Sequence, residues 1–509
     1  MTKENKLHRL ITPIILALIL AGCQPAATPT PQKVIETVVV TEVVEATSVE
    51  VLQVVTPTPE PAGPRTLVIC EGQEPDTLYP YGGSLKATSD ILEAISEGSW
   101  SGYDSNSYAY QPTIIEKLPD LGDGDASLAT VKVSEGSTVV DAFGDVVELD
   151  PAAGIMLTPA GRGEPVAYEG GEFEMDQLSA TFSLLPDLLW SDGTPLTAAD
   201  SVYAFKLLAD PNTLFPKYSL ERTATYEAID DLTIVWTGLP GFLDSTYYLN
   251  FFGPAPEHSW GKYSAEELLT AEESSLAPIG WGPYVIDEWV QGDRVTLHKN
   301  PNYYRAAENL PKFDHLIYRF VGQNGNANIA ALLSGECDIL AQLTGLDDQI
   351  ELMIAMQNTG QVNATFTTGT VWSLISLGIQ HIDYDDGFNL NTDRPDYFSD
   401  VRTRKAFAMC IDRQALVDNL TYGQAKVIDN YLPPEHPVSN PDVIHYDFDV
   451  NAGNALLDEV GWLEVDGDPA TPRVAQDIPG VPDGTELKVT MGVISIPLIQ
   501  KFVEILQDS

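Results

Sequence analysis

Carboxylates are the most numerous side chains of this sequence that could take part in chemistry. The chain has 74 aspartates and glutamates, 27 lysines and arginines, 7 histidines and 4 cysteines among its 509 residues. Two carboxylates at a suitable distance can hydrolyse a glycosidic bond, but many of them on a chain of formal charge −47 are surface residues. Asp192 lies in a Ser-Asp-Gly turn, and Asp200 follows Thr197 at the spacing of a helix capping box. We therefore predict structural roles for both and no catalytic residue, with a secreted carboxylate-dependent hydrolase as the alternative.

Histidines and acidic loops predict no metal site either. The histidines show no HExxH motif, and the loops 120–125 and 466–468 do not match the EF-hand pattern. The sequence also contains no GxSxG elbow and no Walker loop. We predict that the protein binds no metal and no cofactor.

The charge and the cysteines exclude further classes of protein. A chain of net charge −47 would repel a phosphate backbone, so we expect no nucleic-acid partner. Four cysteines are too few for a disulfide scaffold. Cys70, Cys337 and Cys410 lie in apolar segments and are predicted to pack as small hydrophobic residues, with a Cys337–Cys410 disulfide as an open alternative.

The N-terminus has the pattern of an exported, lipid-anchored protein. Basic residues precede the apolar run 10–20, which has the length of a signal-peptide core and is too short to span a bilayer. The run ends in Leu20-Ala21-Gly22-Cys23, which resembles a bacterial lipobox. We predict a signal peptide over 1–22, lipid attachment at Cys23, and a Pro/Thr/Val-rich tether over 23–64 on the extracytoplasmic side of the membrane. The alternatives are a soluble secreted protein and, for 34–55, a strand that pairs with a partner.

The rest of the chain alternates strand and helix patterns, which indicates an α/β class with mixed α+β elements. We expect a strand over 66–70, a loop over 76–83 and an amphipathic helix over 87–95. Short β runs follow over 113–180, then a hairpin around the turn Gln291-Gly292-Asp293 and a buried strand over 336–340. Asp400, Asp412 and Asp449 are predicted to cap three further helices.

Five ordered segments resemble the oligopeptide, dipeptide and nickel class, family 5, of the extracellular solute-binding proteins of ABC transporters. They are WSDGTPLTAADSVYAFKLL, GPYVIDEWVQGDRVTLHKNPNYY, LLSGECDIL, DVRTRKAFAMCIDRQALV and DFDVNAGNALLDEVGW. The resemblance implies a two-lobed periplasmic-binding-protein-like fold with an extra β-rich subdomain in lobe I. It places the main part of lobe I at 65–108 and 251–380, the β-rich subdomain at 109–250, a hinge near 378–389 and lobe II at 381–509. Family members continue beyond the point that matches Ser509, so lobe II is expected to be incomplete, and the insert 122–174 is longer than the family pattern requires.

The resemblance also implies a function and a site. The function would be capture of an extracytoplasmic solute, an oligopeptide or dipeptide before an oligosaccharide or a metal chelate, and its delivery by a monomer to an ABC permease. A sensor subunit is an alternative that the sequence does not separate from import. The group that pairs with the peptide amino terminus is expected beyond Ser509. The candidate ligand-binding residues are Tyr81, Gly82, Gly83, Ser84, Trp100, Tyr110 and Trp372.

Overall fold

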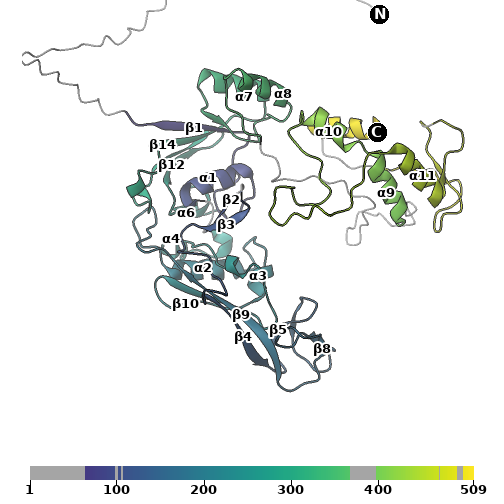
Figure 1. Ribbon diagram of the computed structural model, residues 1–509. Coiled ribbons are helices and arrows are strands. Elements are labelled where there is room, and N and C mark those ends of the chain that lie inside the picture. The colour runs from purple at the N-terminus through teal and green to yellow at the C-terminus, as the bar shows by residue number, and fades with distance from the viewer. Residues whose placement is uncertain are drawn as a thin grey trace, which may run out of the picture. The chain divides into compact units, whose positions relative to one another are not determined.

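The computed structural model describes residues 63–97, 101–104, 107–366, 397–468, 470–489 and 497–508. Within them, the main sheet has five strands (Figure 1). In spatial order these are β12 (Tyr284–Val290), β13 (Arg294–Lys299), β14 (His315–Phe320), β1 (Thr66–Glu71) and β15 (Ile339–Leu340). β1 is parallel to both β14 and β15, whereas β12, β13 and β14 pair antiparallel. The sheet is therefore mixed, and its parallel half joins strands that are far apart in the sequence.

Helix α1 (Lys86–Ser96) covers this sheet, and its bounds confirm the predicted amphipathic helix. Ala87, Ile91, Ala94 and Ile95 are buried on one helix face, at the spacing of consecutive turns. Ile91, Ala94 and Ile95 share a hydrophobic cluster with residues of β12, β13 and β14. Each large apolar side chain buried in this way contributes roughly 1.5–3 kcal/mol, which fixes the helix to the sheet.

A second sheet has four antiparallel strands. In spatial order these are β10 (Thr223–Ala228), β11 (Thr233–Gly238), β9 (Phe173–Ser183) and β4 (Ala126–Val133). The chain between β4 and β9 forms two hairpins, β5–β6 (Thr138–Val140 and Val146–Glu148) and β7–β8 (Met156–Leu157 and Val166–Ala167). A further hairpin joins β2 (Ser101–Asp104) to β3 (Ala109–Pro112). These hairpins confirm the predicted β-rich runs.

The Ser-Asp-Gly turn and helix α2 (Ala198–Ala209) are held by the two predicted structural carboxylates. Asp192 accepts a hydrogen bond from the N–H of Thr194 at 2.9 Å, which closes the turn. Asp200 accepts from the N–H of Thr197 at 2.9 Å and from Trp190 Nε1 at 3.4 Å. Burial raises the pKa of Asp200 although these hydrogen bonds oppose the shift. The geometry explains both carboxylates as folding devices.

Short helices lie in the connections between strands along the chain. They are α3 (Tyr218–Glu221), η1 (Tyr247–Leu249), α4 (Glu257–Trp260), α5 (Ala265–Leu268), α6 (Glu272–Ser275) and η2 (Ala306–Glu308). Two longer helices, α7 (Gly325–Ser334) and α8 (Ile350–Asn358), flank β15 in the sequence, and α7 ends at Gly335 with φ of 79°. The predicted buried strand over 336–340 is wrong in part. β15 covers two residues at the edge of the described sheet, and Ile339 is 45% exposed.

The regular elements of the described C-terminal residues are mostly helices. They form α9 (Val401–Cys410), α10 (Arg413–Leu420), α11 (Val450–Val460), the hairpin β16–β17 (Trp462–Leu463 and Val474–Ala475) and α12 (Pro497–Asp508). Asp400, Asp412 and Asp449 accept hydrogen bonds from main-chain N–H groups of α9, α10 and α11 at 2.8, 2.9 and 2.9 Å. These three caps confirm the predicted helix starts.

Several predictions lie outside the described residues. They are the signal peptide, Cys23, the tether, Trp100, Trp372 and the hinge near 378–389. The domain boundaries stay predictions. Across the part of the chain that the structure describes, no helix is both long enough and apolar enough to cross a bilayer.

Candidate functional site: the carboxyl edge of the main sheet

The parallel strands β1, β14 and β15 end at one edge of the main sheet. Three loops leave this edge, over residues 72–85, 321–324 and 341–349, and the first two lead into α1 and α7. In open α/β sheets, ligands bind outside the carboxyl ends of the strands. The predicted ligand loop Tyr81–Ser84 belongs to the first of these three loops, so the fold places it on the expected edge.

Glycines let the three loops pack backbone against backbone. A Cβ added at Gly72 would lie 1.7 Å from the carbonyl oxygen of Leu343, and one at Gly325 would lie 2.0 Å from that of Gly345. No side chain fits at such distances, so these positions require glycine. These two contacts pack the backbone at Gly72 and at Gly325 closely against the loop 341–349.

The buried amide of Asn328 joins two of the loops. Its Nδ2 donates to the carbonyl of Gly322 at 2.8 Å and to the carbonyl of Thr344 at 2.7 Å. Asn328 is 3% exposed, so breaking these bonds would leave buried polar groups without partners. The amide therefore fixes the spacing between the loops that follow β14 and β15.

The first loop is anchored at several points. Glu74 Oε1 accepts from Trp289 Nε1 and from the N–H of Gly292, both at 2.9 Å, which ties the loop to the β12–β13 turn. The N–H of Leu78 donates to the carbonyl of Ser275 in α6 at 2.8 Å. The first half of the loop is therefore anchored at two points, which contributes to the preorganisation that a binding loop needs.

A disulfide joins β1 to the residues just before β15. Cys70 and Cys337 are 0% and 1% exposed, and their Cα atoms are 5.8 Å apart. Their predicted packing as small free hydrophobic residues is therefore wrong, and so is the alternative Cys337–Cys410 pair, because Cys410 is a free, half-buried thiol. Pairing depends on the parallel register of β1 and β15, which local sequence patterns do not reveal.

The four predicted residues of the glycine loop differ in their surroundings. The ring of Tyr81 is half-buried, with ring centroids 5.5 Å from Tyr79 and 6.3 Å from Phe215, and burial raises the pKa of its phenol. The N–H of Gly82 donates to the carbonyl of Tyr79 at 2.9 Å, and a Cβ at Gly83 would lie 2.6 Å from Asp76 Oδ1. Ser84 is exposed. Tyr81 thus supports the loop by packing, whereas the side chain of Ser84 is open to solvent.

Main-chain donors gather at the end of this loop. The N–H groups of Gly83 and Ser84 have no acceptor within the described part of the chain, and α1 begins directly after Leu85 without a side-chain cap. The first N–H groups of a helix have no partner within the helix. These donors suit the carbonyl and carboxylate oxygens of a ligand, which they would bind without any covalent step.

Glu71 is a buried carboxyl at the end of β1 that the sequence interpretation missed. It is 2% exposed, and its Oε1 has no hydrogen-bond partner in the described residues. Burial, and then the charge of Asp90, raise the pKa of Glu71 to about 7, although Lys86 opposes the shift. The signal in the sequence was a carboxylate that directly follows an apolar strand and precedes a glycine. Asn328 was missed as well. Its partners, the carbonyls of Gly322 and Thr344, lie in loops outside α7, so the sequence of the helix does not reveal them.

The remaining described candidate is Tyr110 in β3. It is 39% exposed, and its ring centroid lies 6.2 Å from that of Tyr248 next to Tyr247 of η1. This aromatic neighbour of Tyr110 belongs to segment 247–249. No group of three or more metal-ligating side chains is present among the described residues.

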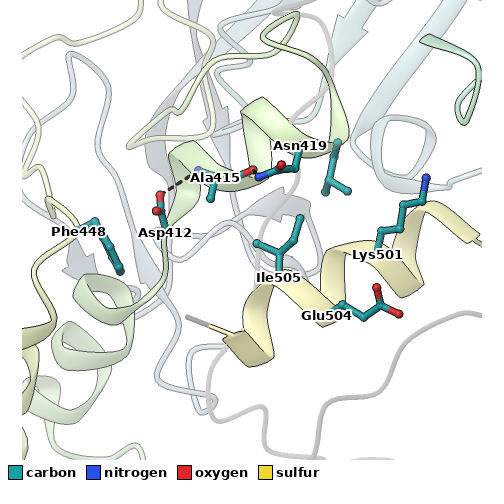
Figure 2. Close-up of a pocket in the computed structure, with 8 residues that line it drawn as sticks. Asp412, Ala415, Asn419, Phe448, Lys501, Glu504 and Ile505 are labelled. Carbon is teal, nitrogen blue, oxygen red and sulfur yellow. Dashed lines mark hydrogen bonds between the residues drawn. The ribbon is translucent and has the colours of Figure 1, made fainter. Parts of the chain in front are cut away.

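A groove is present between α10 and α12 (Figure 2), and it contains none of the predicted site residues. Its volume is about 640 Å³, and it is lined by Asp412, Ala415, Asn419, Leu420, Phe448, Lys501, Glu504 and Ile505. Asp412 already accepts a hydrogen bond from the N–H of Ala415, as the dashed line in Figure 2 shows. The sheet edge, which carries the predicted glycine loop, is therefore kept as the candidate site.

The fold and the sequence define the class of protein. The family model of the bacterial extracellular solute-binding proteins, family 5, middle region, matches residues 164–491. The chain belongs to this family, and the predicted α/β fold class is confirmed. In fold it is similar to the oligopeptide-binding protein AppA of Bacillus subtilis in complex with a nonapeptide, with a TM-score of 0.53 and 17% identity over 87% of this chain and 72% of that one. It is equally similar to NikZ of Campylobacter jejuni in complex with Ni(L-His), with a TM-score of 0.53 and 17% identity over 87% of this chain and 71% of that one.

Curated relatives carry related names. A Brucella ovis protein named as an ABC transporter peptide-binding protein is 30% identical over 302 residues, which are 58% of this chain and 51% of that protein. The periplasmic oligopeptide-binding protein OppA of Salmonella typhimurium is 24% identical over 270 residues, which are 50% of this chain and 46% of that protein. The chain spans about half the length of the curated relatives that it matches.

Proposed function

We propose that this chain captures an extracytoplasmic oligopeptide or dipeptide and presents it to an ABC permease, as the substrate-binding component of an importer. The observation that carries the proposal is the family match over residues 164–491. The names of the relatives support a peptide as the solute. Because the family and its relatives are transport binding proteins, no residue is assigned a catalytic role.

The sheet edge supplies a mechanism for binding. An extended peptide offers carbonyl groups that can pair with main-chain donors, and the donors of Gly83 and Ser84 stand on a loop anchored by Glu74 and Leu78. The proposed second lobe, 381–509, would close on the ligand. Closure follows if the ligand makes contacts in the closed state that it lacks in the open one. No bond is made or broken in this process.

We also propose that the mature protein is a monomer anchored to the membrane through a lipid on Cys23. The lipobox-like sequence ending at Cys23 and the Pro/Thr/Val-rich residues after it support this anchor. Intact-mass analysis of the protein from its membrane fraction is expected to show a diacylglyceryl adduct on Cys23. A Cys23→Ser variant should accumulate as the unprocessed precursor without that adduct, and an unmodified Cys23 in the membrane fraction would contradict the anchor.

The function is tested first by native mass spectrometry of the full chain carrying Cys23→Ser. Peptide adducts that vanish on denaturation would support the proposal and identify the ligand. Synthetic peptides, oligosaccharides and Ni(L-His) are then titrated by calorimetry, and each mixture is checked for hydrolysis. Binding of a sugar or chelate alone, or turnover of a substrate, would contradict the peptide proposal.

A matched pair of variants tests the site. Gly83→Ala places a methyl group 2.6 Å from Asp76 Oδ1, and Gly122→Ala places one 2.9 Å from Asp120 Oδ1 in the β-rich region. We expect Gly83→Ala to weaken peptide binding about tenfold or more, because a shifted loop loses its aligned donors, while Gly122→Ala binds normally. Equal affinity of the two variants would remove the glycine loop from the site.

A further inference from the structure

The side chain of Glu71 lies between the end of β1 and helix α1. Successive residues of a strand face opposite sides of a sheet. Leu67 and Ile69 pack against the hydrophobic cluster that contains α1, so Glu71, two residues after Ile69, faces the same side. It is 2% exposed, and its Oε1 has no hydrogen-bond partner among the described residues. A carboxyl group is therefore buried under α1 without a partner for one of its oxygens.

The charged groups that α1 presents to Glu71 are mostly acidic. Asp90 opposes its ionisation and Lys86 favours it, and the effect of Asp90 is the larger. Lys86 Nζ forms an ion pair with Asp90 Oδ1, so this ammonium group is already bound to a carboxylate. Glu93 lies one helical turn after Asp90 and adds a further negative charge. An ionised Glu71 would therefore be a buried carboxylate next to other carboxylates, which is strongly unfavourable.

Two tyrosines face this cluster from the sheet. Tyr318 of β14 faces Glu71, and its hydroxyl donates to the carbonyl of Asp90 at 2.9 Å. Tyr284 of β12 faces Tyr318. Burial raises the pKa of both phenols, so they stay neutral and supply no compensating charge.

The end of β1 is fixed and leaves the strand little room to move when Glu71 ionises. The N–H of Val321 donates to the carbonyl of Glu71 at 2.9 Å. On the other side of the strand, a Cβ at Gly72 would lie 1.7 Å from the carbonyl oxygen of Leu343. The strain of an ionised Glu71 must therefore be relieved by α1 and by the loop 72–85 that leads into it.

Helix α1 and this loop move together, because Thr88 joins them. Thr88 Oγ1 donates to the carbonyl of Thr77 at 3.0 Å and to Asp76 Oδ1 at 3.2 Å. The candidate ligand donors, the N–H groups of Gly83 and Ser84, lie between these contacts and the start of α1. A displacement of the first turns of α1 therefore displaces the donors.

We propose that Glu71 is a proton-dependent switch of the candidate site. Neutral Glu71 holds α1 and the loop 72–85 in the arrangement that binds the ligand, and ionised Glu71 releases them. The release of the loop follows from the surroundings of Glu71 alone, whereas the effect on ligand affinity rests on the proposed function.

The direction of the pH dependence follows from burial. Burial, and then Asp90, raise the pKa of Glu71 from 4.5 to about 7. A raised pKa gives a stabilising contribution that is complete below pH 4.5 and is lost as the pH rises through about 7. The protein is therefore expected to hold its ligand more tightly at pH 6 than at pH 8.

Hydrogen exchange tests the release of the loop without any ligand. The full chain carrying Cys23→Ser is measured by mass spectrometry at pH 6 and pH 8, and each rate is corrected for the intrinsic exchange rate at that pH. In peptides from 72–96 we expect opening to be about tenfold more frequent at pH 8, which is the ratio given by pKa values of 4.5 and about 7. Glu71→Gln should remove this difference, and Glu148→Gln, at an exposed glutamate of β6, should keep it.

The exchange experiment has two outcomes that would overturn the switch. One is equal opening of 72–96 at the two pH values in the protein with Glu71 intact, a result that stands even if Glu71→Gln does not fold. The other is a difference that persists in Glu71→Gln.

Calorimetry tests the effect on binding, with the peptide that native mass spectrometry identifies. The affinity should fall by up to about tenfold from pH 6 to pH 8, and titrations at pH 7.5 in phosphate and in Tris should show net proton uptake on binding. Both effects should be absent from Glu71→Gln, to which the peptide's own amino group contributes equally. Equal affinity at the two pH values, or the same proton uptake in Glu71→Gln, would overturn the link to the ligand. If no peptide binds, the proposed function fails, while hydrogen exchange still decides whether Glu71 controls the loop.

Discussion

Removal of the Cys70–Cys337 disulfide should destabilise the main sheet strongly. The two cysteines are 267 residues apart in the sequence, so the bond closes a very long loop in the unfolded chain. The chain-entropy relation for a loop of 267 residues gives about 5.6 kcal/mol at 25 °C. Measured losses for native disulfides are about 2–5 kcal/mol, so we expect Cys70→Ala/Cys337→Ala to lose at least about 2 kcal/mol.

The assay must report on the main sheet itself, because different parts of a long chain need not unfold together. Hydrogen exchange in rising urea, measured by mass spectrometry on peptides from β1, β14 and β15, gives the free energy of opening of that sheet. Cys410→Ala is the control, because Cys410 is a free thiol outside the bridge. The double variant should also show a steeper dependence on urea, since its unfolded chain exposes more surface. A loss below about 1 kcal/mol, or an equal loss in Cys410→Ala, would refute the reasoning.

Three further changes have defined outcomes. Because the pKa of Glu71 is raised from 4.5 to about 7, its contribution to stability is present below pH 4.5 and lost as the pH rises to about 7. Glu71→Gln should therefore raise the free energy of unfolding in urea at pH 8 by up to about 3 kcal/mol, and much less at pH 4. Equal effects at the two pH values would contradict the buried carboxyl. The carboxylate of Asp429 lies 2.6 Å from His445 Nδ1 and raises the pKa of His445. The pair therefore stabilises the fold below the ordinary histidine pKa. This contribution is lost as the pH rises through the pKa of His445 in the folded protein. Titration of His445 by NMR should show a lower pKa in Asp429→Asn. An unchanged pKa would show that Asp429 does not interact with His445. Asp449→Ala should destabilise α11 by about 1 kcal/mol in thermal unfolding, because it removes the 2.9 Å acceptor of the Ala452 N–H, whereas Asp449→Asn should lose only a few tenths.

Local signals in the sequence were enough to predict much of the secondary structure. The caps Asp400, Asp412 and Asp449 act on N–H groups two or three residues away, so their positions follow from spacing alone. The turn Gln291-Gly292-Asp293 likewise predicted the β12–β13 hairpin. The segment 336–340 failed because an apolar run does not reveal whether another strand will cover it.

The candidate site was only partly predictable for the same reason. Gly82 and Gly83 were chosen because the family resemblance implies a ligand loop after the first strand, and the structure places them in the loop that follows β1. Glu71 and Asn328 acquire their character from residues that are distant in sequence or on other elements, such as Asp90 and Thr344. The Cys70–Cys337 bond likewise follows from the register of β1 with β15. Contacts of this kind follow from tertiary structure and not from local pattern.

The backbone contacts at Gly72 and Gly325 determine how this edge of the sheet could be redesigned. A mutant library that randomises the whole edge would be filled with unfolded members, because any Cβ at these two positions overlaps a carbonyl oxygen. Useful diversity is restricted to solvent-facing neighbours such as Gln73, Ser84 and Gln323, whose side chains are exposed. A new recognition specificity could therefore be screened with a small combinatorial set at these sites, while the glycines are kept constant.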